Sequence, residues 1–152
     1  MKNKNKHLGY YTGAKFEKVI IEQLSKEGFE PVKDKTLSDG KRRVKDLKAD
    51  ILVNTGHKLE CKTTTDKTNL TFAVFEDGRK VNIKFHQICA ADYFLFEFRP
   101  NPTFVVKKTD FLIWWSNLPT NKKGKTKMSI VWKDVKKIGF KLKDFSFLKE
   151  EK

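Results

Sequence analysis

The sequence predicts a single α/β domain in which a mixed central β-sheet is flanked by helices. The chain has 152 residues, the size of one domain, and a chain of this length buries roughly 68–70% of the surface that it exposes when unfolded. Hydrophobic residues make up 38% of the sequence and include 13 Phe and 3 Trp, which is enough for a core. Apolar runs typical of strands are interspersed with segments of helical apolar spacing. We see no internal repeat, so we expect residues 1–152 to form one domain.

The first predicted element is a helix. Thr12 can cap it, and Gly28 can end it. Its apolar positions recur every four residues at Phe16, Ile20 and Leu24. A short strand at Phe29–Lys33 should follow. The polar and basic stretch from Asp34 to Lys48 then predicts a loop near the ligand.

Two pairs of strand-like runs come next. Ala49–Val53 and Lys58–Thr63 flank four residues with the polar and Gly content of a tight turn, so we expect an antiparallel hairpin. Leu70–Phe75 and Lys80–Ile83 flank a second turn signal. We interpret this pair as an edge hairpin of the sheet, with a hairpin laid along DNA as the alternative. A short helix should begin near Phe85.

The most apolar run of the sequence, Tyr93–Phe98, predicts a central strand. A Pro-containing turn separates it from its expected neighbour at Thr103–Lys107. The remaining predicted elements are a short helix capped by Thr109, a strand at Ser129–Trp132, and a helix at Asp134–Ile138 that ends at Gly139. The tail after Lys149 should fray.

The charge balance points to a polyanionic partner. The 33 Lys and Arg residues exceed the 19 Asp and Glu residues by 14. Such a charge attracts nucleic acids and releases counterions from them, whereas solubility needs a net charge of only about 2–8. DNA is therefore the first partner to consider, with solubility as the alternative. Candidate contacts in the predicted loops are Arg42, Arg43 and Lys45, which either read bases or bind phosphates, and Lys122 and Lys123, which lie in either a phosphate-binding finger or a solvated loop.

The composition also excludes several classes. No run of about 18 apolar residues can span a bilayer, and the first ten residues lack the apolar centre of a secretion signal, so we expect a cytoplasmic, nucleoid-associated protein. Cys61 and Cys89 form no CxxC pair and should be reduced core residues. The three His residues are widely separated. A catalytic metal would then be held by carboxylate oxygens, which favour Mg²⁺, with Mn²⁺ as a possible substitute.

Acidic residues interrupt the apolar strands of the first predicted hairpin. Because side chains alternate along a strand, Glu60 and Lys62 should face one side, while Leu59 and Cys61 face the other side, toward the core. The hairpin would bring Asp50 close to Glu60. Two carboxylates so close repel each other unless a cation neutralises them. A metal there would polarise a phosphate oxygen and activate water, with Lys62 stabilising the developing charge. The alternative is a structural Glu–Lys pair.

Asp50, nine intervening residues and then Glu60-Cys61-Lys62 resemble the signature of the PD-(D/E)XK nuclease superfamily, with Ala49 where a proline often stands. The resemblance implies a restriction-endonuclease-like core in which Asp50 and Glu60 bind magnesium and Lys62 assists the attacking water. Gly13-Ala-Lys-Phe-Glu17 resembles a pattern of archaeal Holliday-junction-cleaving enzymes, which implies that Glu17 joins the metal site. An ordinary exposed helical glutamate is the alternative for Glu17.

Residues 50 to 115 also resemble the bacterial RecU-type Holliday junction resolvases in the order and rough spacing of their motifs. This resemblance implies that Gln87 contacts the scissile phosphate or a metal-bound water, with His86 beside it. It also implies that Thr63 and Thr64 donate hydrogen bonds to the DNA backbone. Asp46 and Glu22 are weaker alternative ligands.

We therefore expect a magnesium-dependent DNA endonuclease that resolves Holliday junctions in DNA recombination. Cutting both strands of a symmetric substrate implies a homodimer or a higher symmetric assembly. The tandem Trp114 and Trp115 should lie in the core or in such an interface. The same core serves restriction and homing endonucleases, which form the first alternative. A basic nucleic-acid-binding protein without catalysis is the second.

Overall fold

The computed structural model describes residues 2–33, 49–73, 75–76, 80–81, 91–117 and 127–149. Its helices are α1 (Lys2–Lys26), α3 (Lys108–Ser116), α4 (Trp132–Ile138) and the 3₁₀ helix η2 (Ser146–Lys149). Its strands are β1 (Pro31–Lys33), β2 (Ile51–Val53), β3 (Lys58–Thr64), β4 (Asn69–Ala73), β5 (Phe75–Glu76), β6 (Lys80–Val81), β7 (Tyr93–Phe98), β8 (Phe104–Lys107), β9 (Lys127–Val131) and β10 (Phe140–Lys141). None of the helices in this part of the chain is long and apolar enough to cross a membrane.

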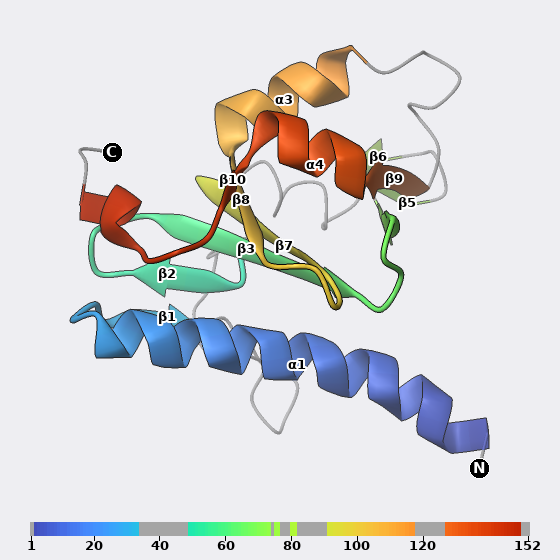
Figure 1. Cartoon of the computed structure of the whole chain (residues 1–152), viewed down its shortest axis with the longest axis horizontal. Coiled ribbons are helices and arrows are strands. Elements are labelled where there is room, and N and C mark those ends of the chain that lie inside the picture. The colour runs from blue at the N-terminus through green and yellow to red at the C-terminus, as the bar shows by residue number, and fades with distance from the viewer. Residues whose placement is uncertain are drawn as a thin grey trace.

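A six-stranded mixed sheet in the order β1-β2-β3-β7-β8-β10 forms the centre of the fold. β3 and β7 run parallel, and every other neighbouring pair in this sheet is antiparallel. Figure 1 shows α1 along one face of the sheet and α3 and α4 on the other. The prediction of a mixed sheet flanked by helices is therefore confirmed.

An apolar cluster lies on each face of the sheet. On the α1 face, Phe16, Ile20 and Leu24 pack with alternate residues of β2, β3 and β7, and with Phe145 and Leu148 from the end of the chain. On the opposite face, the phenylalanines of β7 pack with α3, α4 and the β4–β9 ribbon. The four-residue spacing in the sequence thus identified the buried side of α1 correctly.

The first helix differs from the prediction only at its start. α1 begins at Lys2, so Thr12 lies inside it and is not the cap. Residues 2–11 contain several lysines and no proline, and lysine has a high helix propensity. The end is as predicted: Gly28 adopts a φ of 92°, and the backbone N–H of Phe29 donates to the carbonyl of Leu24 at 3.0 Å, which closes the helix. β1 therefore starts at Pro31, two residues later than expected.

The predicted hairpin of β2 and β3 is confirmed. The second predicted hairpin does not form an edge of the six-stranded sheet. β4 pairs with β9, and β5 pairs with β6 in a separate two-stranded sheet. The reason is burial: Leu70 of β4 and Ile130 of β9 are 3% and 0% exposed and belong to the cluster under α3 and α4. The β4–β9 ribbon therefore lies over a face of the sheet.

The C-terminal elements also shift. Thr109 is not a cap, because α3 starts at Lys108 with Lys107 as the N-cap residue and no side-chain cap. α4 starts at Trp132, two residues early, and ends before Gly139 as predicted. β10 pairs with β8, and η2 returns to α1, where the backbone N–H of Phe145 donates to Oε1 of Glu27 at 2.7 Å. The sequence predicted neither β10 nor η2. The predicted helix near Phe85 lies outside the described residues.

Candidate active site

The β2–β3 hairpin brings Asp50 to the segment Leu59–Cys61. The antiparallel pairing of β2 with β3 begins at Ile51, which lies opposite Leu59, and Asp50 directly precedes it. Two hydrogen bonds fix this arrangement: the backbone N–H of Asp50 donates to the carbonyl of Leu59 at 3.0 Å, and the backbone N–H of Cys61 donates to Oδ2 of Asp50 at 2.8 Å. The predicted proximity of Asp50 to the Glu60-Cys61-Lys62 segment is therefore present.

Glu60 and Lys62 form an ion pair on one face of β3. Nζ of Lys62 lies 3.4 Å from Oε2 of Glu60, and the two side chains are 14% and 2% exposed. Leu59 and Cys61 belong to the cluster on the α1 face, as the alternation predicted. A buried carboxylate is costly unless it is paired, and Lys62 supplies the opposite charge. A purely structural Glu–Lys pair would show the same interaction.

The thiol of Cys61 lies within electrostatic range of all four charged residues of the predicted catalytic set. Burial raises the pKa of this thiol well above its usual value, and the carboxylates of Asp50, Glu17 and Glu60 raise it further, while Lys62 lowers it. Glu17 on α1 therefore lies within electrostatic range of the same sulfur as the three hairpin residues. The helix thus brings Glu17 within electrostatic range of the hairpin, and its role at a metal site stays a prediction.

The donor set fits a hard divalent cation. Asp50 and Glu60 offer carboxylate oxygens from one hairpin, and Mg²⁺ is commonly held by one or two protein carboxylates together with waters and substrate phosphates. Within the described ranges, no three His, Cys, Asp or Glu side chains are grouped closely enough to hold a metal ion. The geometry thus brings two carboxylates to one hairpin but does not join Glu17 to them as a third ligand.

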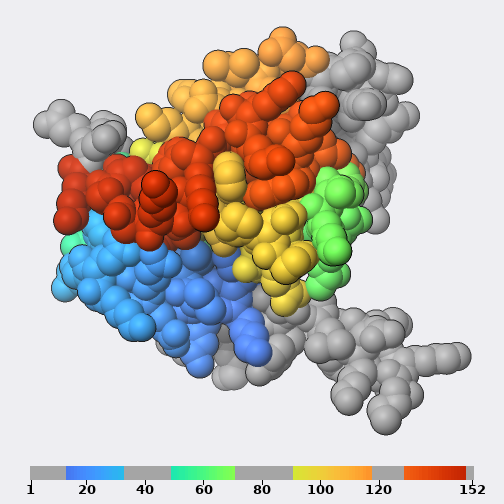
Figure 2. Space-filling view, in the orientation of Figure 1, coloured from blue at the N-terminus to red at the C-terminus, as the bar shows by residue number. Residues whose placement is uncertain are grey.

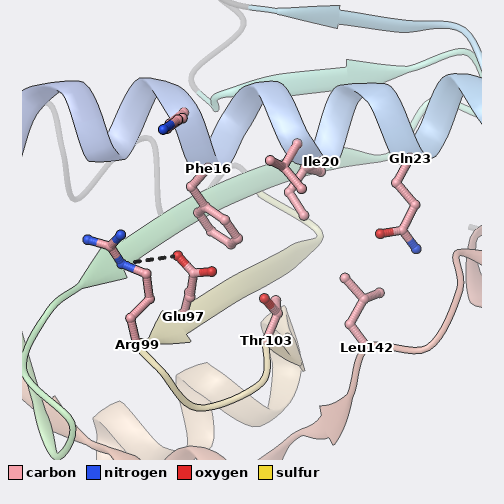
Figure 3. A pocket seen from close by; sticks show the side chains of 9 residues that line it. Phe16, Ile20, Gln23, Glu97, Arg99, Thr103 and Leu142 are labelled. Carbon is pink, nitrogen blue, oxygen red and sulfur yellow. Dashed lines mark ion pairs between the residues drawn. The ribbon is translucent and has the colours of Figure 1, made fainter.

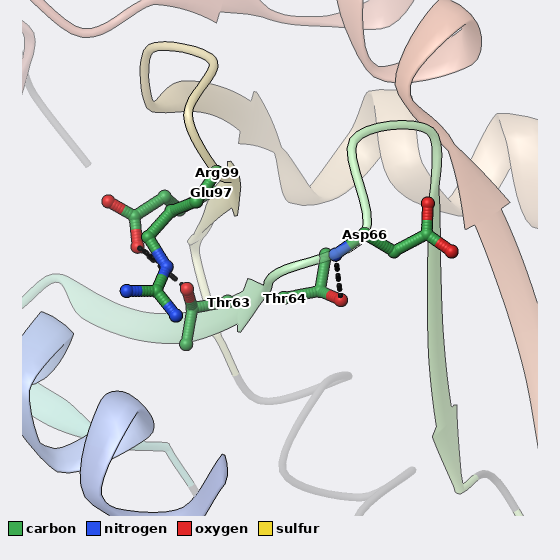
Figure 4. Close-up of polar contacts among 5 residues, drawn as sticks. All are labelled: Thr63, Thr64, Asp66, Glu97 and Arg99. Atoms are coloured by element: carbon green, nitrogen blue, oxygen red, sulfur yellow. Dashed lines mark hydrogen bonds and ion pairs between the residues drawn. The ribbon is translucent and has the colours of Figure 1, made fainter. Parts of the chain in front are cut away.

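Thr63 and Thr64, at the end of β3, have partners that the sequence did not predict. The hydroxyl of Thr63 donates to Oε1 of Glu97 at 2.6 Å, and Nε of Arg99 lies 3.8 Å from the same oxygen (Figure 4). Oγ1 of Thr64 accepts a bond of 3.1 Å from the backbone N–H of Asp66. The sequence did offer one indication of a role for Glu97, because it is a charged residue inside the apolar run Tyr93–Phe98.

Glu97 and Arg99 also border a pocket of about 190 Å³ between α1 and the end of β7. Figure 3 shows Phe16 and Ile20 from α1 on one side of it and Thr103 and Leu142 on the other. The volume is below the roughly 300–1,000 Å³ of pockets that enclose drug-sized ligands. The pocket lies on the α1 face, whereas Glu60 and Lys62 face the opposite side of the sheet.

Seven predicted site residues lie outside the described part of the chain. These are Arg42, Arg43, Lys45, His86, Gln87, Lys122 and Lys123. Their roles remain predictions.

Comparisons with known proteins bear on the fold. No family model matches the sequence, and no curated protein matches it. Among solved structures, this chain is similar to Hjc of Archaeoglobus fulgidus, a Holliday junction resolvase from an archaeal hyperthermophile. The superposition covers 86% of this chain and 96% of Hjc, with a TM-score of 0.52 and 15% sequence identity. The similarity confirms the predicted restriction-endonuclease-like fold and the resemblance to archaeal resolvases at the level of the fold.

Proposed function

We propose that this chain is a metal-dependent endonuclease that hydrolyses phosphodiester bonds of DNA, with four-way junctions as its substrate. The observation that carries the proposal is the hydrogen bond that holds Asp50 beside Cys61, the residue between Glu60 and Lys62, which form an ion pair. The resolvase-like fold and the net charge of +14 support it. The process that this activity serves would be DNA recombination.

Each residue of the hairpin has a distinct task in this proposal. Asp50 and Glu60 would hold Mg²⁺, which when bound polarises the scissile phosphate and lowers the pKa of a water molecule. Lys62 would orient the attacking water and stabilise negative charge on the phosphate. The hydrogen bond from Cys61 to Asp50 keeps the carboxylate of Asp50 beside the strand that carries Glu60 and Lys62.

Further residues complete the proposal. Glu17 would add negative charge near the hairpin from α1 without ligating the metal, and Gln87 with His86 beside it would contact the scissile phosphate or its water. Thr64 would contact the DNA backbone, whereas the hydroxyl of Thr63 is donated to Glu97. Because a symmetric junction is cut in both strands, two active sites are needed, and a homodimer supplies them.

A cleavage panel tests the function. Four-way, linear and single-stranded DNA are incubated with the chain in Mg²⁺ or in Ca²⁺, which often occupies oxygen sites without supporting the chemistry. We expect cutting of the junction in Mg²⁺ and binding without cutting in Ca²⁺. Cutting of linear duplexes at one sequence would instead indicate a restriction or homing endonuclease. Binding without cutting in any metal would indicate a non-catalytic DNA-binding protein.

A matched pair of variants tests the site. Lys62→Met should retain DNA affinity within about threefold and lose cutting by at least about 100-fold, because removal of a general acid–base or charge-stabilising group costs about 10²–10⁴ in rate. Lys107→Met removes the same charge from an exposed residue of β8 and should cut like the unmodified chain. Unchanged cutting by Lys62→Met would defeat the site assignment.

A further inference from the structure

The end of the chain carries a concentration of exposed positive charge that the proposed active site does not use. We call it the lysine patch. It consists of Lys133, Lys136, Lys137, Lys141, Lys143 and Lys149, all of them exposed. The same segment contains only two acidic residues, Asp134 and Asp144. In Figure 2 this C-terminal segment, drawn in red, forms a continuous part of the visible face from α4 to η2.

Local structure explains why these lysines point outward. In α4, positions 133, 136 and 137 are spaced three and four residues apart and so share one face of the helix. Val135 is fully buried in the cluster beneath α4. β10 pairs with β8 at the edge of the sheet and exposes Lys141. The apolar residues of α4 are thus used in packing, and lysine ammonium groups dominate its outer surface.

Close ion pairs within the described residues do not neutralise the charge of the patch. Among the described residues, no patch lysine forms an ion pair within 4 Å. Asp134 accepts a hydrogen bond of 3.1 Å from Nε1 of Trp114. Asp144 accepts one of 2.9 Å from the backbone N–H of Ser146. The ammonium of Lys136 lies 5.6 Å above the ring centroid of Trp132, which leaves its charge in solvent.

The patch is separate from the candidate active site. α4 and β10 pack against β8, and β7 lies between β8 and β3. Since neighbouring strands are about 4.8 Å apart, β8 is roughly 10 Å from the strand that carries Glu60 and Lys62. One phosphate cannot contact both places. A DNA duplex can, because it presents a phosphate about every 1.7 Å along its axis.

We propose that the lysine patch is a second DNA-contacting surface that binds backbone phosphates outside the active site without reading sequence. Lysine is a point charge on a flexible stem and suits phosphates in any sequence. A membrane surface fits less well, because the apolar side chains of α4 that would enter lipid are packed in the core. The inference rests on the proposed function for the identity of the polyanion but does not require that the chain cut DNA.

Salt dependence of binding tests the patch. Affinity for a fluorescent 20-base-pair duplex is measured by anisotropy in Ca²⁺ between 50 and 200 mM salt, using the full chain and the double variant Lys133→Gln/Lys137→Gln. Each lost phosphate contact lowers the slope of log K against log salt by about 0.9. We therefore expect a slope smaller by about 1.8, so that the unmodified chain loses about 12-fold more affinity over this range than the variant.

A control variant of equal charge makes the test specific. Lys18→Gln/Lys26→Gln removes two exposed lysines from α1 and should keep the slope of the unmodified chain. Equal slopes for the unmodified chain and the patch variant, or an equal decrease in the control, would overturn the inference. So would binding to anionic lipid vesicles that falls in the patch variant while its DNA slope is unchanged.

The outcome is independent of catalysis. If the patch variant lowers the slope but the chain cuts no DNA in Mg²⁺, the patch stands and the nuclease proposal fails. If the chain cuts DNA but the slope does not change, the nuclease proposal stands and the patch fails. Where both hold, cutting at saturating DNA should be unaffected in Lys133→Gln/Lys137→Gln, because these residues lie outside the catalytic hairpin.

Discussion

Oδ2 of Asp50 accepts a 2.8 Å hydrogen bond from the backbone N–H of Cys61, the residue between Glu60 and Lys62. Asp50 lies in a bend before β2, outside the paired residues of the strand. The bond from Cys61 therefore restrains its side chain. One carboxylate oxygen therefore has a structural task, and the negative charge of the group remains beside the Glu60–Lys62 pair.

Two substitutions at Asp50 separate the structural and chemical tasks. In Asp50→Asn the amide oxygen can still accept the bond from Cys61, so the free energy of unfolding should change by less than about 1 kcal/mol. Asp50→Ala leaves that N–H without its acceptor and should cost about 1–3 kcal/mol. Both variants should lose Mg²⁺-dependent cutting, as measured on a four-way junction. Cutting by Asp50→Asn at the unmodified rate would contradict a role as metal ligand.

The raised pKa of Cys61 predicts a loss of stability in alkali. Burial first, then the carboxylates of Asp50 and Glu17, hold the thiol in its protonated form in the folded chain. Because the pKa is higher in the folded than in the unfolded state, this stabilisation is present below the unfolded pKa of about 8.5 and is lost as the pH rises toward the folded pKa.

Urea unfolding at several pH values between 8 and 10 measures this effect against Cys61→Ala. The free energy of unfolding of the unmodified chain should fall more steeply with pH than that of the variant, by up to about 1.4 kcal/mol per pH unit. Titrating lysines affect both proteins equally, so the variant is the control. Parallel pH profiles would show that the thiol ionises as readily in the folded chain as in the unfolded one.

Thr63 and Thr64 should affect different properties, although the sequence assigned both to the DNA backbone. The hydroxyl proton of Thr63 is donated to Glu97, so Thr63→Val should lower the free energy of unfolding by about 1.5 kcal/mol and change DNA affinity less than about twofold. Thr64 uses its oxygen as an acceptor from Asp66, and this bond leaves the hydroxyl free to donate to a phosphate. Thr64→Val should therefore weaken DNA binding about fivefold, equivalent to about 1 kcal/mol. Anisotropy and thermal unfolding distinguish these results.

Local patterns predicted the buried face of α1 and the β2–β3 hairpin, because both depend on neighbours in the sequence. The spacing of Phe16 and Ile20 follows from 3.6 residues per turn, and the opposite orientation of Glu60 and Cys61 follows from the pleat of a strand. The placement of Asp50 beside the Glu60-Cys61-Lys62 segment needed only a short turn between two strands. These features are the ones that the structure bears out.

Contacts between distant segments could not be predicted in the same way. Leu70 pairs with Ile130, sixty positions later, and no local pattern in β4 names β9 as its partner. Strand alternation predicts which face of the sheet Glu60 lies on. It does not predict which segments cover that face and bury Glu60. The bond from Thr63 to Glu97 likewise follows from the parallel pairing of β3 with β7, a long-range contact that strand patterns leave open.

Two glycines provide a test of the packing itself. A Cβ at Gly139 would lie 2.5 Å from the carbonyl oxygen of Val105 and 2.8 Å from Cγ2 of Val106, so α4 and β8 would have to separate. A Cβ at Gly13 would have no heavy atom within 4 Å, and Gly13 lies inside α1.

Gly139→Ala should therefore destabilise the chain by about 1–3 kcal/mol, whereas Gly13→Ala should stabilise it by up to about 1 kcal/mol. For a chain of this size, 1 kcal/mol shifts Tm by about 2–4 °C, which thermal unfolding resolves. A neutral Gly139→Ala would mean that α4 does not pack against β8 as closely as the structure has it, and the position of the lysine patch on α4 would need to be determined again.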